Sequence, residues 1–232
     1  FYRFHHVPTN EEILTEVCDE WIDFIVSLMD IAGLNTKSWR LEQELTKGNV
    51  YSKKIPGWDL RAVKIDVTTT ARPEQFLTVI TDNLISRYED WNENYLDGYK
   101  VKQVTPEVAI YHWKFALKPP ISNRDFLIVQ RIHKYDNGSI LVIDKSIEHG
   151  KVGPIPGFER GKVVFQARYI QPCDNNGHTR YIQMNLTDVK GKVPQSLVNT
   201  ANIKRSVSQV EGILRIVEAD VLTRFIHTAD ST

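Results

Sequence analysis

The chain has 232 residues, of which 41% are hydrophobic and 25% are charged, and its 29 basic residues balance its 29 acidic ones. This length supports one domain with a sizeable core. Zero net charge provides no overall attraction to a polyanion, so no nucleic-acid partner is expected. Cys18 and Cys173 lie far apart and form no metal-binding spacing, which argues against a disulfide scaffold or zinc module. No run of about 18 apolar residues is present, so no transmembrane helix is expected.

The N-terminal part of the chain predicts a helix followed by three strands. Apolar residues recur at three- and four-residue steps over residues 10–33, which is the pattern of an amphipathic helix, and Thr9 or Asn10 suits its N-cap. Alternating stretches then predict an antiparallel meander, because turn-forming Gly and Pro residues separate them. These three strands are expected at residues 39–45, 50–54 and 59–69.

The central and C-terminal parts predict a helical region, six strands and a long helix. Pro73 suits the first position of a helical region that ends at Trp91. Asp136-Asn137-Gly138 is typical of a hairpin turn. A long helix with one apolar stripe is expected at residues 194–225. The six strands are expected at residues 99–104, 108–117, 125–134, 139–148, 162–171 and 179–187.

This order of elements indicates an α+β fold, since strands and helices do not alternate as they do in βαβ proteins. The chain also lacks the glycine-rich dinucleotide and P-loop motifs, the GxSxG nucleophile motif and the HExxH zinc motif. No cofactor is expected. No metal site is expected either, because the adjacent His5 and His6 have no third ligand nearby in the sequence. A catalytic set assembled in space stays an open alternative.

Several short motifs, in their order along the chain, resemble the START family, the steroidogenic-acute-regulatory-related lipid transfer domains. The resemblance covers roughly residues 10–222, and the predicted order of elements agrees with the helix-grip fold of that family. It implies a curved antiparallel sheet wrapped around the last helix, with a lipid cavity between them. The motifs are Trp91-Asn92 after a helix, the strand with Trp113, the turn Ser122-Asn-Arg-Asp-Phe126, the Pro-Gly-rich loop before Gly161-Lys-Val, and Lys192-Val-Pro-Gln-Ser-Leu-Val-Asn199 before the long helix.

The phosphatidylcholine transfer branch of the family is the one that the pattern resembles most, which implies a head-group site. Trp113 stands where an aromatic residue of that branch faces the choline, and aromatic faces attract a quaternary ammonium ion. Tyr169 and Gln171 fall near the corresponding pair on a later strand. Arg87 falls near the basic residue that holds the phosphate there.

The sequence departs from that branch at several of these positions. Asn92 replaces a carboxylate, and Phe126 replaces a tyrosine. Gln130 stands where the sterol-binding branch carries an arginine, which disfavours a sterol. On sequence grounds, each aromatic residue and arginine is equally consistent with a place in the core or on the surface. The candidate lipid-binding residues are Arg87, Trp91, Asn92, Trp113, Phe126, Tyr169, Gln171, Val207, Val210 and Leu214.

The loop at residues 150–158 and the long helix are expected to form a lid over the cavity. Val152, Ile155 and Phe158 are apolar residues that a purely solvated loop does not need, so they are expected to contact a membrane during lipid exchange. The apolar stripe of the helix fits packing on side chains as well as packing on a ligand.

The sequence is interpreted as a START lipid-binding domain at residues 10–225 with tails at residues 1–9 and 226–232. We expect a monomeric, non-enzymatic carrier that encloses one phospholipid, such as phosphatidylcholine, and contacts membranes transiently. The alternatives are a lipid-sensing interaction module without transfer, a sterol or ceramide carrier and, less favoured, a thioesterase-type enzyme. Because the chain starts at Phe1, we expect a domain excised from a longer protein, and a soluble, cytoplasmic location for this fragment.

Overall fold

The structure is a computed structural model, and it describes residues 7–33, 38–82, 85–117, 121–173 and 178–229. Its described strands form one ten-stranded sheet in the order β1-β2-β3-β10-β9-β7-β6-β5-β4, in which all of these neighbours are antiparallel. The short strand β8 pairs in parallel with the start of β6. The strands are β1 (Arg40–Leu45), β2 (Gly48–Lys54), β3 (Arg61–Thr69), β4 (Tyr95–Thr105), β5 (Val108–Phe115), β6 (Asn123–Lys134), β7 (Ile140–Ser146), β8 (Phe158–Arg160), β9 (Lys162–Pro172) and β10 (Thr179–Asp188).

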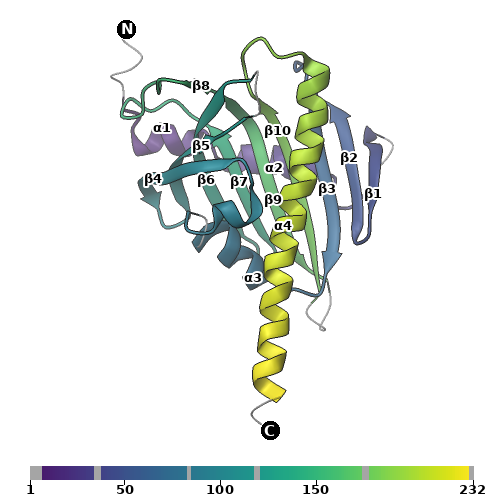
Figure 1. The fold of residues 1–232 in the computed structure, drawn as a ribbon. Helices are drawn as coiled ribbons and strands as arrows, with labels where there is room; N and C mark the ends of the chain where they lie inside the picture. Colours follow the sequence, from purple (N-terminus) through teal and green to yellow (C-terminus); the bar gives the residue numbers. More distant parts are fainter. Residues whose placement is uncertain (1–6, 34–37, 83–84, 118–120, 174–177, 230–232) are drawn as a thin grey trace.

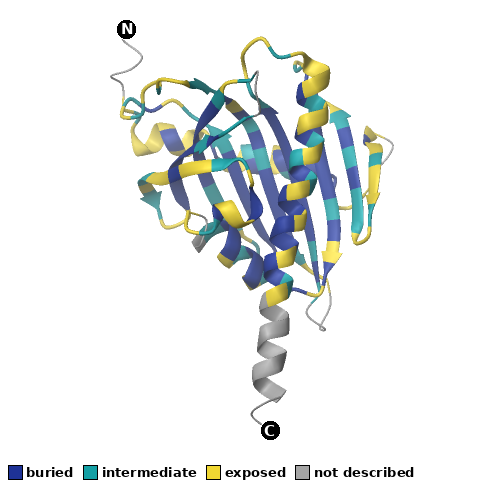
Figure 2. Ribbon diagram, viewed as in Figure 1, coloured by how far each residue is buried: buried dark blue, intermediate teal, exposed yellow. Residues whose placement is uncertain are grey.

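Helices cover both faces of this sheet (Figure 1). The long helix α4 runs across the inner, concave face, and α1 and α2 lie behind the sheet on its outer face. Figure 2 shows that the central strands are buried over most of their length between these layers, whereas the edge strands β1 and β4 are largely exposed or half-buried. The predicted helix-grip fold is therefore confirmed. The helical elements are α1 (Asn10–Thr15), α2 (Asp19–Met29), α3 (Pro73–Leu77), a π-helical turn (Thr78–Asp82), a 3-10 turn (Tyr88–Trp91) and α4 (Gln195–Ala229).

The first helix was predicted to be continuous, and this is wrong, because it breaks into α1 and α2. The two pieces pack on different parts of the outer face: Ile13 of α1 lies in a cluster over β5 and β6, whereas Ile25 of α2 lies in a cluster over β7, β9 and β10. A straight helix cannot follow a curved sheet over both regions. At the break, Arg131 of β6 donates to the free carbonyl of Val17 (2.5 Å) and pairs with Asp19 (2.7 Å).

Helix α4 is attached to the inner face in two different ways. Its first half makes side-chain hydrogen bonds with β10, where Asn185 donates to Oγ of Ser206 (2.9 Å) and Asn202 donates to the carbonyl of Thr187 (3.2 Å). Its second half contributes apolar side chains to the largest core cluster. Between them, Gly212 allows close contact with the 3-10 turn, because a Cβ there would lie 2.8 Å from the Cβ of Trp91.

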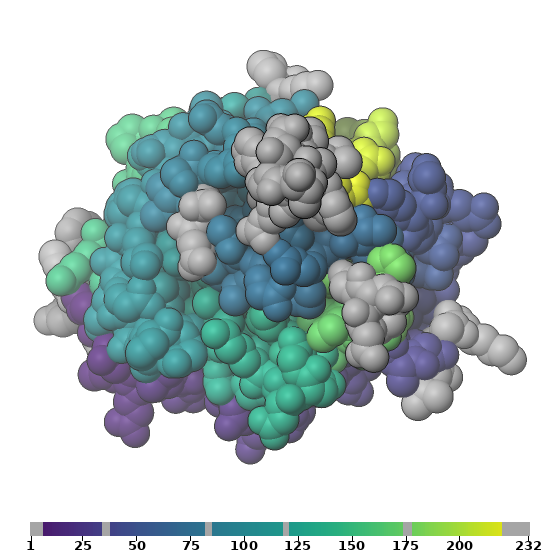
Figure 3. All heavy atoms as spheres, turned by 90° about the horizontal axis from the view of Figure 1, so that it is seen from below, coloured from purple at the N-terminus to yellow at the C-terminus, as the bar shows by residue number. Residues whose placement is uncertain are grey.

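The segment that contains α3 closes the lower end of the sheet and helix. Figure 3 shows this segment in the middle of that end, between the β1–β2 hairpin and the strands β4 and β5. Gln75 of α3 donates to the carbonyl of Val217 in α4 (3.0 Å), and Phe76 stacks on Tyr181 of β10 with 4.8 Å between ring centroids. This segment therefore ties the C-terminal helix to the strands.

Among the described residues, no helix has the length and apolar character needed to span a membrane.

Candidate functional site

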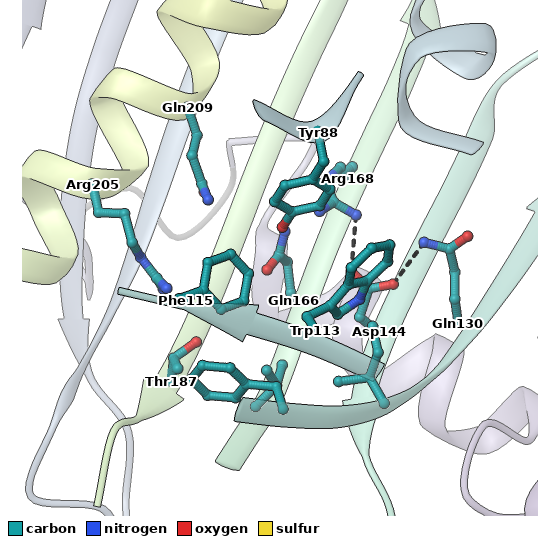
Figure 4. A pocket seen from close by; sticks show the side chains of 13 residues that line it. Tyr88, Trp113, Phe115, Gln130, Asp144, Gln166, Arg168, Thr187, Arg205 and Gln209 are labelled. Atoms are coloured by element: carbon teal, nitrogen blue, oxygen red, sulfur yellow. Dashed lines mark hydrogen bonds and ion pairs between the residues drawn. The ribbon is translucent and has the colours of Figure 1, made fainter. Parts of the chain in front are cut away.

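A cavity of about 30 Å³ lies between the inner face of the sheet and α4. This volume is enough for water but not for a lipid head group. Strands β5, β6, β7, β9 and β10 form most of its wall, and the 3-10 turn and α4 supply the rest. Its lining residues are Tyr88, Trp113, Phe115, Phe126, Ile128, Gln130, Asp144, Val163, Gln166, Arg168, Thr187, Arg205 and Gln209 (Figure 4).

One side of the cavity is an aromatic wall formed by Tyr88, Trp113, Phe115 and Phe126. The ring centroids of Tyr88 and Trp113 lie 4.9 Å apart, and Phe115 lies 5.8 Å from Tyr88 and 5.7 Å from Phe126. Cross-strand pairing of β5 with β6 brings Trp113 opposite Phe126. Such rings present negative faces and positive edges, so this wall can accept both acyl chains and an organic cation.

The opposite side of the cavity holds a buried charged pair. Nη1 of Arg168 lies 2.9 Å from Oδ2 of Asp144, and their side chains are only 2% and 4% exposed. Gln130 donates to the other oxygen of Asp144 (2.9 Å). The amide oxygen of Gln166, in the orientation that satisfies both groups, accepts from Nη2 and Nε of Arg168. Burial by itself lowers the pKa of Arg168, but the carboxylate of Asp144 raises it above its usual range, so Arg168 stays charged.

Helix α4 supplies two polar side chains to the cavity, Arg205 and Gln209. Figure 4 shows Arg205 reaching from the helix toward Phe115 and Thr187. Gln209, one turn further along, accepts from Nε2 of Gln183 on β10 at 3.5 Å. Nε of Arg205 is buried and has no hydrogen-bond partner among the described residues. The cavity thus has one paired and one unpaired guanidinium group.

The structure brings Trp113 and Phe126 to the cavity wall, as predicted, and places Trp91 and Asn92 beside it. Trp91 is buried against Gly212 of α4, and the oxygen of Asn92 accepts from the backbone N–H of Asn94 (3.3 Å). These placements do not by themselves test a role in lipid binding, which stays a prediction.

Arg87 lies at the surface rather than at the cavity, contrary to its predicted place beside the head group. It caps the 3-10 turn, and its Nε pairs with Oδ2 of Asp90 at 2.7 Å. Both side chains are 40% exposed. The local i,i+3 pair therefore occupies the guanidinium group that was expected to bind phosphate.

Tyr169 also lies away from the cavity, which corrects its predicted position. Tyr169 belongs to the outer-face cluster under α2, and Gln171 follows it at the two-residue spacing of the same face of β9. The cavity is lined instead by Gln166 and Arg168, which lie on the inner face. A one-residue error in register moves every side chain of a strand to the other face, and this is the error here.

The apolar stripe of α4 packs into the core rather than lining the cavity. Val210 and Leu214 belong to the inner-face core cluster, and Val207 packs against it. Val210 and Leu214 also border a groove between α4 and the β1–β2 hairpin. The residues of α4 that line the cavity are Arg205 and Gln209, which lie off the apolar stripe.

The loop expected to act as a lid is partly attached to the outer face. Val152 packs against the cluster under α1, and the guanidinium group of Arg160 donates to the carbonyl of Gly153 (3.2 Å). Phe158 begins β8, and its N–H donates to the carbonyl of Ile155 (3.1 Å). All three predicted lid residues are half-buried, and a membrane contact by them stays a prediction.

The sequence reasoning missed Asp144, Arg168 and Arg205. A weak signal existed for two of them, since Arg168 lies two residues after Gln166 on a strand, and Arg205 lies four residues before Gln209 on a helix. Both patterns are also those of solvent-facing residues, so the sequence alone could not assign them to a cavity. His5 and His6 lie outside the described residues. Within the described part of the chain, no group of three His, Cys, Asp or Glu residues is placed to hold a metal ion.

Comparisons with known proteins agree with this architecture. Two relatives are the mouse StAR-related lipid transfer protein 5 (25% identity over 70% of this chain and 72% of that protein) and the Arabidopsis thaliana "Protein ENHANCED DISEASE RESISTANCE 2-like" (26% identity over 68% of this chain). The match spans only 24% of the length of the Arabidopsis protein. Among solved structures, human STARD10 has a TM-score of 0.76 at 14% identity, covering 97% of this chain and 86% of that one.

A second solved structure, that of human StAR-related lipid transfer protein 5, has a TM-score of 0.74 at 17% identity and covers 86% of this chain and 96% of that chain. At these identities the structures show that the fold is shared. The START domain family model matches residues 20–217, which is most of the chain. The chain therefore belongs to the START domain family.

Proposed function

We propose that this domain encloses one phospholipid, such as phosphatidylcholine, between its sheet and α4 and carries it between membranes without changing it chemically. The observation that carries this proposal is the composition of the cavity. An aromatic wall faces polar and charged groups across it, which suits an amphipathic ligand with a cationic head group. Membership of the START family, in which mouse and human relatives are named lipid transfer proteins, supports it further.

Binding requires the cavity to open, because about 30 Å³ cannot hold a lipid. A phospholipid with roughly thirty chain methylenes carries on the order of 24 kcal/mol of apolar burial at about 0.8 kcal/mol each, which can drive such an opening. The side-chain hydrogen bonds between β10 and the first half of α4 are suited to break, since each contributes only about 1 kcal/mol. Movement of α4 would then extend the cavity along the inner face.

The test is native mass spectrometry of the purified domain after incubation with vesicles, followed by transfer of the recovered lipid between labelled vesicles. We expect one phospholipid per chain, of unchanged mass, that moves to acceptor vesicles. Binding without transfer would favour a lipid-sensing module, and a hydrolysed lipid would favour an enzyme. A chain that binds no lipid would contradict the proposal.

The choline preference is tested at the aromatic wall with a matched pair of variants. Trp113→Leu removes an indole from the cavity, whereas Trp39→Leu removes a similarly buried indole from the outer face. We expect Trp113→Leu to reduce the preference for phosphatidylcholine over phosphatidylethanolamine with the same chains, by about fivefold or more, since a desolvated cation–π contact contributes roughly 1–2 kcal/mol. Trp39→Leu should keep the preference, and equal loss in both variants would remove Trp113 from the head-group site.

A further inference from the structure

Arg205 is a half-buried cation without a matching anion. It lines the cavity together with Arg168 and Asp144, whose charges cancel in a 2.9 Å ion pair that Gln130 completes. Arg205 has no ion pair with any described residue, and its Nε is buried without a hydrogen bond. Burial lowers the pKa of Arg205, which is the response of a cation that lacks compensation. The described lining of the cavity therefore carries one net positive charge.

The more deeply buried cations of the described residues have partners that explain them. Arg124 donates to the carbonyls of Ser122, Val189 and Lys190. Lys64 donates to the carbonyl of Met29 (3.0 Å) and lies 4.8 Å from the ring centroid of Trp39. An uncompensated charge in a protein interior costs several kcal/mol, so a fold does not retain one for packing. The location of Arg205 at the cavity suggests that its partner is the ligand.

We propose that Arg205 binds the phosphate group of the enclosed lipid, which assigns to α4 the role predicted for Arg87. The inference rests on the proposed function and specifies its ligand as a lipid with a negatively charged phosphodiester. A guanidinium group binds phosphate oxygens through two parallel hydrogen bonds and stays charged when buried. Gln209 and Thr187 line the cavity beside it and supply further hydrogen-bonding groups. The aromatic wall lies within the same cavity, so one zwitterionic head group can contact both.

The experiment compares two lipids that differ only in the phosphorylated head group. The wild-type chain, Arg205→Gln and Arg205→Lys are incubated with vesicles of dioleoylphosphatidylcholine that carry a minor fraction of dioleoylglycerol, and the bound lipids are identified by native mass spectrometry. Lys204→Gln is the matched control, because Lys204 is the exposed neighbour on the same helix and its replacement changes the charge equally. A single vesicle composition keeps the attraction of the chain to the membrane constant.

We expect Arg205→Gln to lower the ratio of bound phosphatidylcholine to bound diacylglycerol by about ten- to a hundredfold, as the loss of a charged hydrogen bond implies. Arg205→Lys should recover part of the wild-type ratio, because it keeps the positive charge, and Lys204→Gln should have the wild-type ratio. Removal of an uncompensated cation should also leave the midpoint of thermal unfolding of the lipid-free chain unchanged or raised, whereas removal of a structural arginine would lower it.

Three results would overturn the inference. A wild-type ratio in Arg205→Gln would exclude Arg205 as the phosphate ligand while leaving the carrier function intact. An equal loss in Lys204→Gln would assign the effect to overall charge. Stabilisation by inorganic phosphate of a wild-type chain that extracts no lipid would indicate a free-anion site, and in that case the proposed carrier function would fail as well.

Discussion

The two faces of the central strands differ in chemistry although the same segments form both. On β10, Ile182, Met184 and Leu186 face α2 and lie in a large apolar cluster. The residues between them, Gln183 and Asn185, face α4 and make side-chain hydrogen bonds to it. Strand β9 repeats the contrast, with Phe165 and Ala167 on the outer face and Gln166 and Arg168 on the inner one.

This difference indicates which face stabilises the fold and which one binds. Apolar burial is sufficient for stability, and a buried ion pair is often no more stabilising than apolar residues of the same size. The polar inner face is therefore not explained by stability, and binding of an amphipathic ligand explains it better. The outer face is expected to affect only stability, and the inner face to affect lipid selectivity as well.

The largest expected effect comes from separating the charged pair of the inner face. Asp144→Leu leaves Arg168 buried without its carboxylate, which we expect to lower the free energy of unfolding by about 3–5 kcal/mol in urea titrations. The double variant Asp144→Leu with Arg168→Leu removes both charges, and it should recover most of that loss because no unpaired charge remains. It should nevertheless alter which lipids are bound.

A double variant as unstable as Asp144→Leu would mean that the pair holds the fold together, and the contrast between the two faces would fail. Unchanged lipid selectivity in the double variant would show that the charged pair of the inner face does not contribute to lipid binding. Coincident unfolding transitions by fluorescence and circular dichroism are needed to confirm that the free energies are comparable.

The next largest effect is expected from truncating a side chain on the outer face, which tests whether that face contributes to stability alone. Met184→Ala removes a fully buried side chain from the cluster under α2, and a loss of about 2–4 kcal/mol in the free energy of unfolding is expected. Lipid selectivity should stay at the wild-type value when it is measured well below the unfolding temperature. A changed selectivity would show that the outer face also shapes the binding site.

The same two faces show how far the sequence could predict this molecule. The nine longer strands and the C-terminal helix follow from alternation and turn signals, and the resemblance to the START family implied a curved antiparallel sheet; the structure confirms both. The side of β9 that faces the cavity could not be read, because both faces are buried and a polar residue such as Arg168 looks solvent-facing in a sequence. The break between α1 and α2 arises from the curvature of the sheet, which no local pattern encodes.

Prediction of the site was limited for the same reason. Trp113 and Phe126 were selected by the resemblance to the START family, and the structure places both of them at the cavity wall. Arg87 was chosen by its spacing to Trp91, but its position in the 3-10 turn gives it a local partner in Asp90. Arg205 could only be recognised once the structure showed that it lines the cavity and has no anionic partner there.

The smallest expected effect concerns a charged cluster on the outer face, around Asp125. Oδ2 of Asp125 lies 2.8 Å from Nε2 of His112 and 2.7 Å from Nε of Arg160. Burial raises the pKa of Asp125, but the hydrogen bonds from His112 and Arg160 lower it by more. The pKa of Asp125 is therefore below its usual value of 3.8. The unfolded chain therefore takes up this proton at a higher pH than the folded chain does.

The stabilisation from this carboxylate is consequently complete above pH 3.8 and decreases as the pH falls through that value toward the lower pKa of the folded state. Asp125→Asn should be less stable near neutral pH and should lose less stability than the wild type in urea titrations between neutral pH and about pH 3. Asp59→Asn is the control, since Asp59 is exposed, and its stability should depend on pH as that of the wild type does.

Because every charge in this outer cluster has a partner, its variants should leave the ratio of bound phosphatidylcholine to diacylglycerol unchanged. A shift in that ratio would mean that Arg160, which bonds both Asp125 of β6 and the carbonyl of Gly153 in the loop at residues 150–158, also controls access to the cavity.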